Sequence, residues 1–223
     1  MNTTIGFLLI LEEDEFLVVN KPAGMSVLPD GWEKDSPWLV EILKREYPKL
    51  WIVHRLDKVT SGVMVFARTA EAHRVLSMQA EGHEVRKVYH ALVNGQTEWE
   101  QQTARQPLRV NVGHSHRTVV DPVRGKSSET NFHVLESFDR ASLWEAIPTS
   151  GRTHQIRVHA YALGHPILGD TLYSAPPTEL IDRPALHAES LTITHPTNGG
   201  RVTFSAPYPD DFQMALERSK NKG

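Results

Sequence analysis

The 223-residue sequence contains no cysteine. Disulfide bonds, a thiol nucleophile and thiolate metal sites are therefore excluded. Long apolar runs are missing as well, because the first one, Ile5 to Leu11, is broken by Glu12 and is too short to span a bilayer. Since no basic segment of an export signal precedes this run, we expect a cytoplasmic protein without a membrane partner.

A large excess of charge of one sign is also absent. Lys and Arg number 24 against 27 Asp and Glu, and the formal net charge is −3. Such a chain does not coat nucleic acid by bulk charge, but a local basic groove is not excluded. Residues 105–126 carry a local charge of +4, from Arg105, Arg109, Arg117, Arg124 and Lys126 against Asp121. Two interpretations stay open, a solvated loop and a surface that faces RNA phosphates.

The pattern of short segments predicts an α+β fold. β-Branched or alternating runs predict strands over residues 16–20, 62–69, 84–95, 128–138, 140–151, 191–196 and 201–207. Apolar residues at helical spacing predict helices over residues 36–48, 69–82 and 152–166. We expect one domain over residues 1–223, with a mixed, largely antiparallel β-sheet core and flanking helices. Residues 219–223 are expected to form a disordered tail.

Each predicted helix carries its own end signals. Ser36, Thr69 and Thr153 are placed to cap the three helices at their N-termini. Gly82 and Gly164 are placed to end the second and third helices.

One carboxylate stands in an unusual place. Asp57 lies in a mostly apolar run, two residues after Arg55 and just before the strand predicted over residues 62–69. A surface turn before a strand is one interpretation. On the helix predicted over residues 152–166, Arg157 is expensive to bury unless a carboxylate pairs with it. Asp57 is the partner that we predict, either in a structural ion pair or as an active-site carboxylate held ionised by the guanidinium.

Two other kinds of site are not supported by the spacing. The sequence has 12 histidines, but His154 and His159 are five residues apart, which places them about 140° apart around a helix. No glutamate and histidine pair of the zinc-protease type accompanies them, so we predict no metal and expect His154 to orient a neighbour or bond the backbone. Ser61 lies in no G-x-S-x-G elbow, which argues against a serine triad.

Several motifs together resemble the RluA-type pseudouridine synthases. They are FLVVNKPAGMSV (16–27), HRLDKVTSGVMVFART (54–69), RKVYHALVNG (86–95), GRTHQIRVHAYALGHPILGDTLY (151–173), ALHAESLTITHP (185–196) and VTFSAP (202–207). They follow one another over roughly residues 7–208. H-R-L-D followed by T-S-G, with G-R-x-H-Q-I-R about a hundred residues later, is a specific combination.

The resemblance implies a pseudouridine synthase fold and an enzyme that isomerises uridine within RNA. The uracil leaves C1′, turns and rejoins through C5, without cofactor or metal. Asp57 resembles the catalytic aspartate, and Arg157 resembles the arginine that pairs with it. Tyr89 matches the tyrosine that stacks on the target base and is a candidate for removing the C5 proton.

The resemblance also implies residues that bind the substrate. Arg55 matches an arginine that enters the RNA stack where the target nucleotide has left, and Ile156 matches an apolar pocket residue. Arg152, His154 and Lys87 are further substrate-binding candidates. The partner implied is a structured RNA, a stem-loop of 23S rRNA or of tRNA.

The resemblance to the family is incomplete. Many members carry an N-terminal S4 domain, which we do not find here, so we expect one catalytic domain that recognises its RNA alone, as a monomer. Residues 97–127 match least well, and Trp32 has no assigned role beyond stacking on a base or packing. Two alternatives are a non-catalytic RNA-binding protein that retains the fold and a hydrolase that releases free uracil. Intact Asp57, Tyr89 and Arg157 argue against the first.

Overall fold

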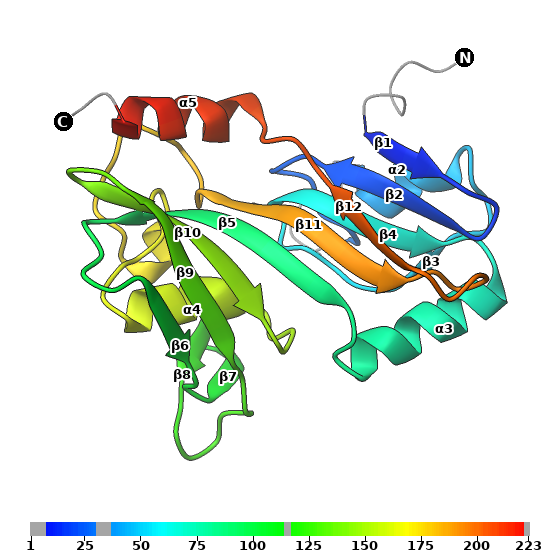
Figure 1. The fold of residues 1–223 in the computed structure, drawn as a ribbon, viewed down its shortest axis with the longest axis horizontal. Coiled ribbons are helices and arrows are strands. Elements are labelled where there is room, and N and C mark those ends of the chain that lie inside the picture. Colours follow the sequence, from blue (N-terminus) through cyan, green and yellow to red (C-terminus); the bar gives the residue numbers. More distant parts are fainter. Residues whose placement is uncertain (1–7, 30–36, 114–116, 221–223) are drawn as a thin grey trace. The chain divides into compact units, whose positions relative to one another are not determined.

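The computed structural model describes residues 8–29, 37–113 and 117–220. The chain divides into two compact units, each described by itself below (Figure 1). The first comprises residues 1–87 and 188–207, and the second comprises residues 88–187 and 208–223. The expectation of one catalytic domain over residues 1–223 stays a prediction. Within the described part of the chain, no helix is both long and apolar enough to cross a bilayer.

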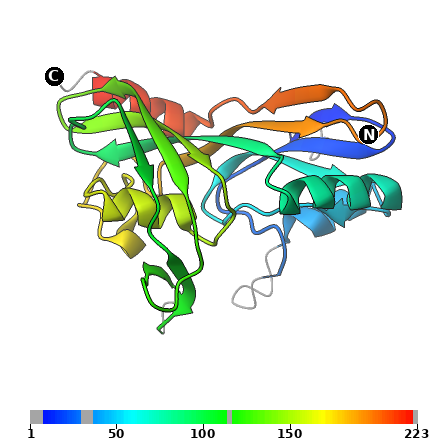
Figure 2. The same ribbon diagram turned by 60° about the horizontal axis from the view of Figure 1, so that its bottom comes forward.

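The first unit is built on antiparallel strands. They are β1 (Leu9–Glu12), β2 (Phe16–Lys21), β3 (Trp51–Ile52), β4 (Ser61–Ala67), β11 (Leu186–Thr194) and β12 (Arg201–Ser205). β2 pairs with β4 from Phe16 opposite Ala67 to Lys21 opposite Gly62. All seven residues of β4 are buried, as expected of a strand covered on both faces. The helices α2 (Leu39–Lys44) and α3 (Ala70–Glu81) lie on one face of these strands (Figure 2).

The second unit contains four antiparallel strands that pair in the order β5-β10-β9-β6. These strands are β5 (Arg86–Asn94), β6 (Gln101–Ala104), β9 (Thr130–Ser137) and β10 (Ala141–Pro148). A separate two-stranded sheet consists of β7 (Leu108–Val112) and β8 (Arg117–Val120). The helical elements are α4 (Gln155–Ala162), the 3-10 turn η1 (Thr171–Tyr173) and α5 (Asp210–Lys220). Trp144, Ile156 and Phe212 lie in the buried core of this unit.

The predicted α+β fold with its largely antiparallel sheet is confirmed by these pairings. The helix α3 begins and ends as the sequence predicts. The backbone N–H of Ala72 donates a hydrogen bond to Oγ1 of Thr69, at 3.1 Å, and Gly82 is the C-cap residue. Leu76 and Gln79 face inward, whereas Met78 is exposed.

The starts of the other two predicted helices differ from expectation. α2 begins only after Trp38, a residue without a side-chain cap, and the predicted cap Ser36 lies outside the described residues. For α4 the predicted cap Thr153 is wrong, because the cap residue is His154, in the left-handed region at φ 55°. The side chain of His154 makes no capping hydrogen bond. It bonds Tyr173 instead, so a tertiary contact overrides the local cap signal.

The C-terminal helix α5 is not predicted by the sequence. Phe212 and Ala215 are fully buried, and the hydroxyl of Ser219 donates to the carbonyl of Ala215 at 2.8 Å. Lys220 forms an ion pair with Glu136, at 2.8 Å. The assignment of residues 219 and 220 to a disordered tail is therefore wrong, because tertiary contacts order them, while residues 221–223 lie outside the described residues.

Candidate active site

The loop that carries Asp57 is held in place by a buried lysine. The side chain of Lys21 is inaccessible to solvent, and its ammonium donates to the carbonyls of Pro22 and Met25, both at 2.8 Å, and of Lys58, at 3.2 Å. The N–H of Gly24 donates to the same Lys58 carbonyl, at 2.8 Å. Two of these four bonds end on carbonyls of the turn after β2, and the other two end on the carbonyl of Lys58, so the bonds join this turn to the Asp57–Lys58 segment.

Asp57 itself is half-buried at the entrance to β4. Its carbonyl accepts a hydrogen bond from the N–H of Thr60, at 3.0 Å, which closes a tight turn directly before Ser61 begins the strand. Gly62 follows at φ +122°, and a Cβ there would lie 2.2 Å from the carbonyl oxygen of Ala188. Only glycine fits at that position. The T-S-G of the motif thus closes the turn and lets β4 lie against β11.

His54, three residues before Asp57, is a structural acceptor. Its Nε2 accepts a hydrogen bond from the N–H of Val65, at 3.2 Å, so the ring is neutral with its proton on Nδ1. Burial lowers the pKa of His54 to about 3, and the charge of Lys87 contributes. Burial also lowers the pKa of Lys87. Arg55, between His54 and Asp57, is exposed to solvent.

In the second unit, Arg157 is fixed by a carboxylate that the sequence did not single out. Its Nε lies 2.6 Å from Oδ2 of Asp170 and its NH2 nitrogen lies 2.7 Å from Oδ1. The side chains are 5% and 1% exposed, so this bidentate ion pair is buried. The guanidinium also lies over the ring of Tyr173, 5.1 Å from its centroid. Pairing of Arg157 with Asp57 stays a prediction.

His154 is held by the same tyrosine. The hydroxyl of Tyr173 accepts from the N–H of Thr118 at 3.0 Å and lies 2.9 Å from Nδ1 of His154. The direction of the bond between this hydroxyl and Nδ1 depends on the tautomer of the imidazole, since a hydroxyl both donates and accepts. Burial raises the pKa of Tyr173. A left-handed conformation at a residue other than glycine is strained and is often found at functional sites.

The remaining predicted residues of the second unit are partly or fully enclosed. Tyr89 is half-buried on β5, opposite Ala146 of β10, and packs against the core. Ile156 is buried in that core. The NH2 group of Arg152 donates to the carbonyl of Ser127 at 3.5 Å.

The eight predicted site residues are thus divided between the two units. Arg55, Asp57 and Lys87 belong to the first, and Tyr89, Arg152, His154, Ile156 and Arg157 belong to the second. Their convergence into one site stays a prediction. Among the described residues, no group of three His, Asp or Glu side chains could hold a metal ion.

The basic region 105–126 is folded rather than a simple loop. It contains β7 and β8, and two of its arginines are paired, Arg105 with Glu129 at 2.7 Å and Arg109 with Asp121 at 3.0 Å. Backbone N–H groups that donate to Asp121 lower the pKa of this carboxyl. Its other basic residues, Arg117, Arg124 and Lys126, are exposed. They form the part of the region that is available to phosphates.

The fold and the motifs define an RNA-modifying isomerase. Residues 15–162 match the model of the family described as RNA pseudouridylate synthase, and the chain belongs to this family. It is therefore an RNA pseudouridine synthase, as the motifs predict.

Individual relatives agree with this placement. The chain is 39% identical over 201 residues to the dual-specificity RNA pseudouridine synthase RluA of Escherichia coli strain K12, across 89% of this chain and 92% of that protein. It is 37% identical over 232 residues to an uncharacterized RNA pseudouridine synthase of Mycobacterium bovis, across 98% of this chain and 74% of that protein.

A solved structure of similar fold is human RNA pseudouridylate synthase domain containing 1. Its TM-score is 0.76 at 29% identity, covering 94% of this chain and 86% of that one. Human RNA pseudouridylate synthase domain containing 4 has the same fold, with a TM-score of 0.78 at 23% identity, covering 94% and 92%.

Proposed function

We propose that this chain acts as a cytoplasmic monomer on specific uridines in a stem-loop of 23S rRNA or tRNA, with Asp57 as the catalytic residue. The observation that carries the proposal is the way in which the turn around Asp57 is held in place. Its turn is closed against β4 and locked by the buried ammonium of Lys21, and a reacting group needs such a rigid mount. The 39% identity to an enzyme that is named a dual-specificity RNA pseudouridine synthase supports testing more than one class of RNA.

The chemistry assigned to Asp57 follows from its carboxylate. It attacks C1′ of the target uridine, or stabilises the cationic sugar, while the bond between C1′ and N1 breaks. The detached uracil turns and forms a bond from C5 to C1′. C5 then loses its proton and N1 gains one, so the reaction is an isomerisation with no net loss of atoms. Tyr89 is the proposed acceptor of the C5 proton and the face on which the base stacks.

Arg157 is proposed to hold the carboxylate of Asp57 ionised and aimed. A guanidinium whose Nε and NH2 are both bonded to Asp170 cannot rotate, so its remaining edge has a fixed direction. Asp170 thereby sets the geometry of Arg157. Ile156 beside it is proposed to line an apolar pocket that retains the detached base.

The target nucleotide must leave its stack before Asp57 can reach C1′. Arg55 is exposed and is proposed to fill the gap that the flipped nucleotide leaves. Contacts to the RNA backbone are proposed for Lys87, Arg152 and His154, and for the exposed basic residues of the β7–β8 region.

The test is pseudouridine mapping on total RNA from source cells that lack the gene, complemented with the wild type, with Asp57→Ala or with Asp14→Ala. Asp14 is an exposed acid of the same unit, so its variant controls for loss of a charge. We expect one or a few sites to disappear and to return with the wild type and Asp14→Ala only. Sites that return with Asp57→Ala would refute the role of Asp57, and unchanged maps would refute the proposed substrates.

A further inference from the structure

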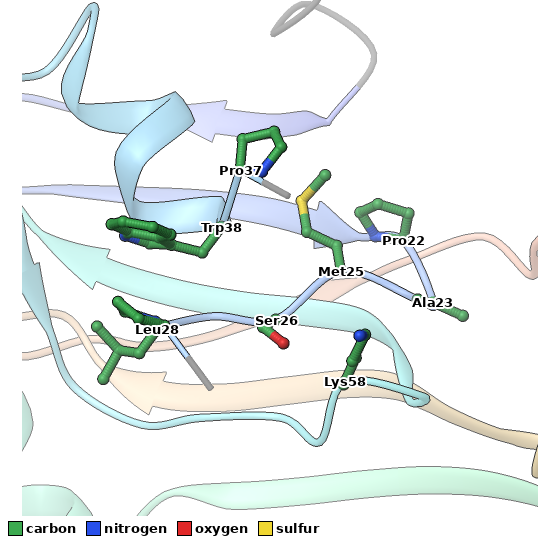
Figure 3. Close-up of a pocket in the computed structure, with 10 residues that line it drawn as sticks. Pro22, Ala23, Met25, Ser26, Leu28, Pro37, Trp38 and Lys58 are labelled. Atoms are coloured by element: carbon green, nitrogen blue, oxygen red, sulfur yellow. The ribbon is translucent and has the colours of Figure 1, made fainter. Parts of the chain in front are cut away.

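The first unit contains a pocket whose lining residues have no role in the proposed reaction. Its volume is about 330 Å³. Figure 3 shows Trp38 and Leu28 at one end of the pocket and Pro22 and Lys58 at the other, with Met25 between them. Trp38, Met25, Leu28 and Lys58 are all half-buried, so each has a face that is open to a ligand.

The pocket is preformed by backbone hydrogen bonds. The N–H of Leu39 donates to the carbonyl of Ser26 at 2.9 Å, and that of Val40 donates to the carbonyl of Val27 at 3.3 Å. These bonds fix the segment after the turn against the start of α2. Together with the bonds of Lys21, they hold both walls without a ligand, which lowers the entropy lost on binding.

The chemistry of the walls suits a flat, uncharged ring joined to an anion. An indole, a thioether and proline rings offer broad apolar surfaces for stacking. Among the lining residues that the structure describes, Lys58 alone is charged and none is a carboxylate. A volume near the lower end of the roughly 300–1,000 Å³ range of ligand pockets accommodates one base and excludes a base pair.

The position of the pocket identifies the source of that ring. Lys58 follows Asp57 directly, so the two Cα atoms are about 3.8 Å apart. A nucleic acid whose target sugar lies at Asp57 therefore has its neighbouring nucleotide within reach of the Lys58 end of the pocket. Bases unstacked from RNA loops are commonly bound on aromatic side chains.

We propose that this pocket binds an unpaired base flanking the target uridine, stacked on Trp38, with Lys58 directed to the adjoining phosphate. The inference rests on the proposed function, because it takes Asp57 as the position of the target sugar. It makes the pocket a determinant of which stem-loops are substrates, since an RNA without an unpaired base at that position leaves the pocket empty.

The test uses the stem-loop around the uridine found by mapping, synthesised with one abasic nucleotide at a time on either side of the target. Trp38→Leu removes the flat ring but keeps an apolar side chain, whereas Trp38→Phe keeps a stacking face. We expect Trp38→Leu to raise Kd for the intact stem-loop about tenfold, within the range for loss of one stacked base. Trp38→Phe is expected to bind nearly as the wild type does.

The abasic series separates stacking from a structural defect. One abasic position should weaken binding by the wild type to the level of Trp38→Leu and should not weaken Trp38→Leu further. The proposal would be overturned if every abasic position weakened binding by Trp38→Leu as much as it weakens binding by the wild type. It would also be overturned if Trp38→Leu bound the intact stem-loop with the Kd of the wild type. Thermal unfolding of each variant accompanies the measurement, and if Trp38→Leu fails to fold, Lys58→Met replaces it, with a shallower salt dependence of Kd expected.

Turnover of the wild type on the same stem-loop separates the two hypotheses. Pseudouridine formed by the wild type, with no coupling between Trp38 and any flanking base, overturns the pocket proposal alone. Absence of pseudouridine in every RNA overturns the proposed function, and the base-binding proposal with it.

Discussion

Arg157 and Asp170 form a buried, bidentate ion pair, with nitrogen–oxygen distances of 2.6 and 2.7 Å. Breaking such a pair by removing one partner leaves a buried charge without compensation, which costs about 3–5 kcal/mol. Asp170→Asn is therefore expected to lower the free energy of unfolding by roughly 3 kcal/mol and to reduce kcat. Urea unfolding and single-turnover kinetics measure the two effects. Asp182→Asn, at an exposed acid of the same unit, should change neither.

A double variant distinguishes a catalytic role of the pair from a structural one. Replacing both members by apolar residues, as in Arg157→Met with Asp170→Ala, removes the buried charges together. Stability should recover by about 1–3 kcal/mol relative to Asp170→Asn, while turnover should stay low because no guanidinium remains. Recovery of turnover along with stability would contradict the proposed role of Arg157.

Asp57→Ala is expected to abolish turnover while leaving the fold intact. The carboxylate is half-buried, whereas the turn itself is held by the backbone of Asp57, Thr60 and Lys58. The free energy of unfolding should change by less than about 1 kcal/mol. Release of tritium from RNA labelled at uridine C5 measures turnover, and residual release at the wild-type rate would remove Asp57 from the mechanism.

Tyr89→Phe tests the phenol separately from the ring. The phenylalanine keeps the stacking face, so Kd for the stem-loop should change less than twofold, about 0.4 kcal/mol. If the hydroxyl removes the C5 proton, kcat should fall by roughly 10²–10⁴, the range of general acid–base catalysis. Tyr161→Phe is the matched control, because Tyr161 is 48% exposed. Unchanged kcat in Tyr89→Phe would exclude the phenol from proton transfer.

Lys21→Met should destabilise the first unit. The methionine fills a similar volume but leaves the carbonyls of Pro22, Met25 and Lys58 without the ammonium donor. Loss of a buried donor costs about 1–3 kcal/mol, and we expect a value at or above the top of this range because three acceptors share it. Chemical denaturation gives the value, and Lys49→Met, at an exposed position, should be nearly neutral. Equal stability of the two variants would show that Lys21 does not hold the loop.

The lowered pKa values of two histidines lead us to expect that the folded protein is less stable in acid. Burial lowers the pKa of His54 to about 3 and lowers that of His159 as well. His159 is inaccessible to solvent, its Nε2 lies 3.1 Å from the carbonyl of Gln106 and its Nδ1 lies 2.9 Å from the hydroxyl of Thr130. Both hydrogen bonds suit the neutral ring, with Nε2 as donor and Nδ1 as acceptor.

The sign of this effect follows from the lowered pKa values. The unfolded chain binds these protons below about pH 6.5 and the folded chain does not. Their contribution to stability is therefore complete above pH 6.5 and declines as the pH falls toward the folded values. Between pH 7.5 and 5, His54 alone should cost about 2 kcal/mol of unfolding free energy. His54→Gln and His159→Gln should each flatten this dependence, whereas His83→Gln, at an exposed histidine, should leave it unchanged.

The helices and strands whose ends and spacing depend on residues close together in the sequence could be predicted. The helix α3 follows from the cap at Thr69, the apolar spacing through Leu76 and the glycine at its end, all within reach of one another along the chain. The strand pair β9–β10 and the β11–β12 hairpin follow from alternation and short turns. The family motifs around Asp57 identified the class of enzyme because each motif is a continuous stretch of sequence.

The sequence by itself determined the class of fold, most elements and the identity of the candidate reacting residues. Only the tertiary structure decided that Asp170 bonds Arg157, because a buried guanidinium pairs with whichever carboxylate the fold brings within hydrogen-bonding distance. It also decided that α4 begins after a strained His154 bonded to Tyr173, and that Lys21 joins two turns 37 residues apart. These contacts depend on folded distance, which no local pattern of residues encodes.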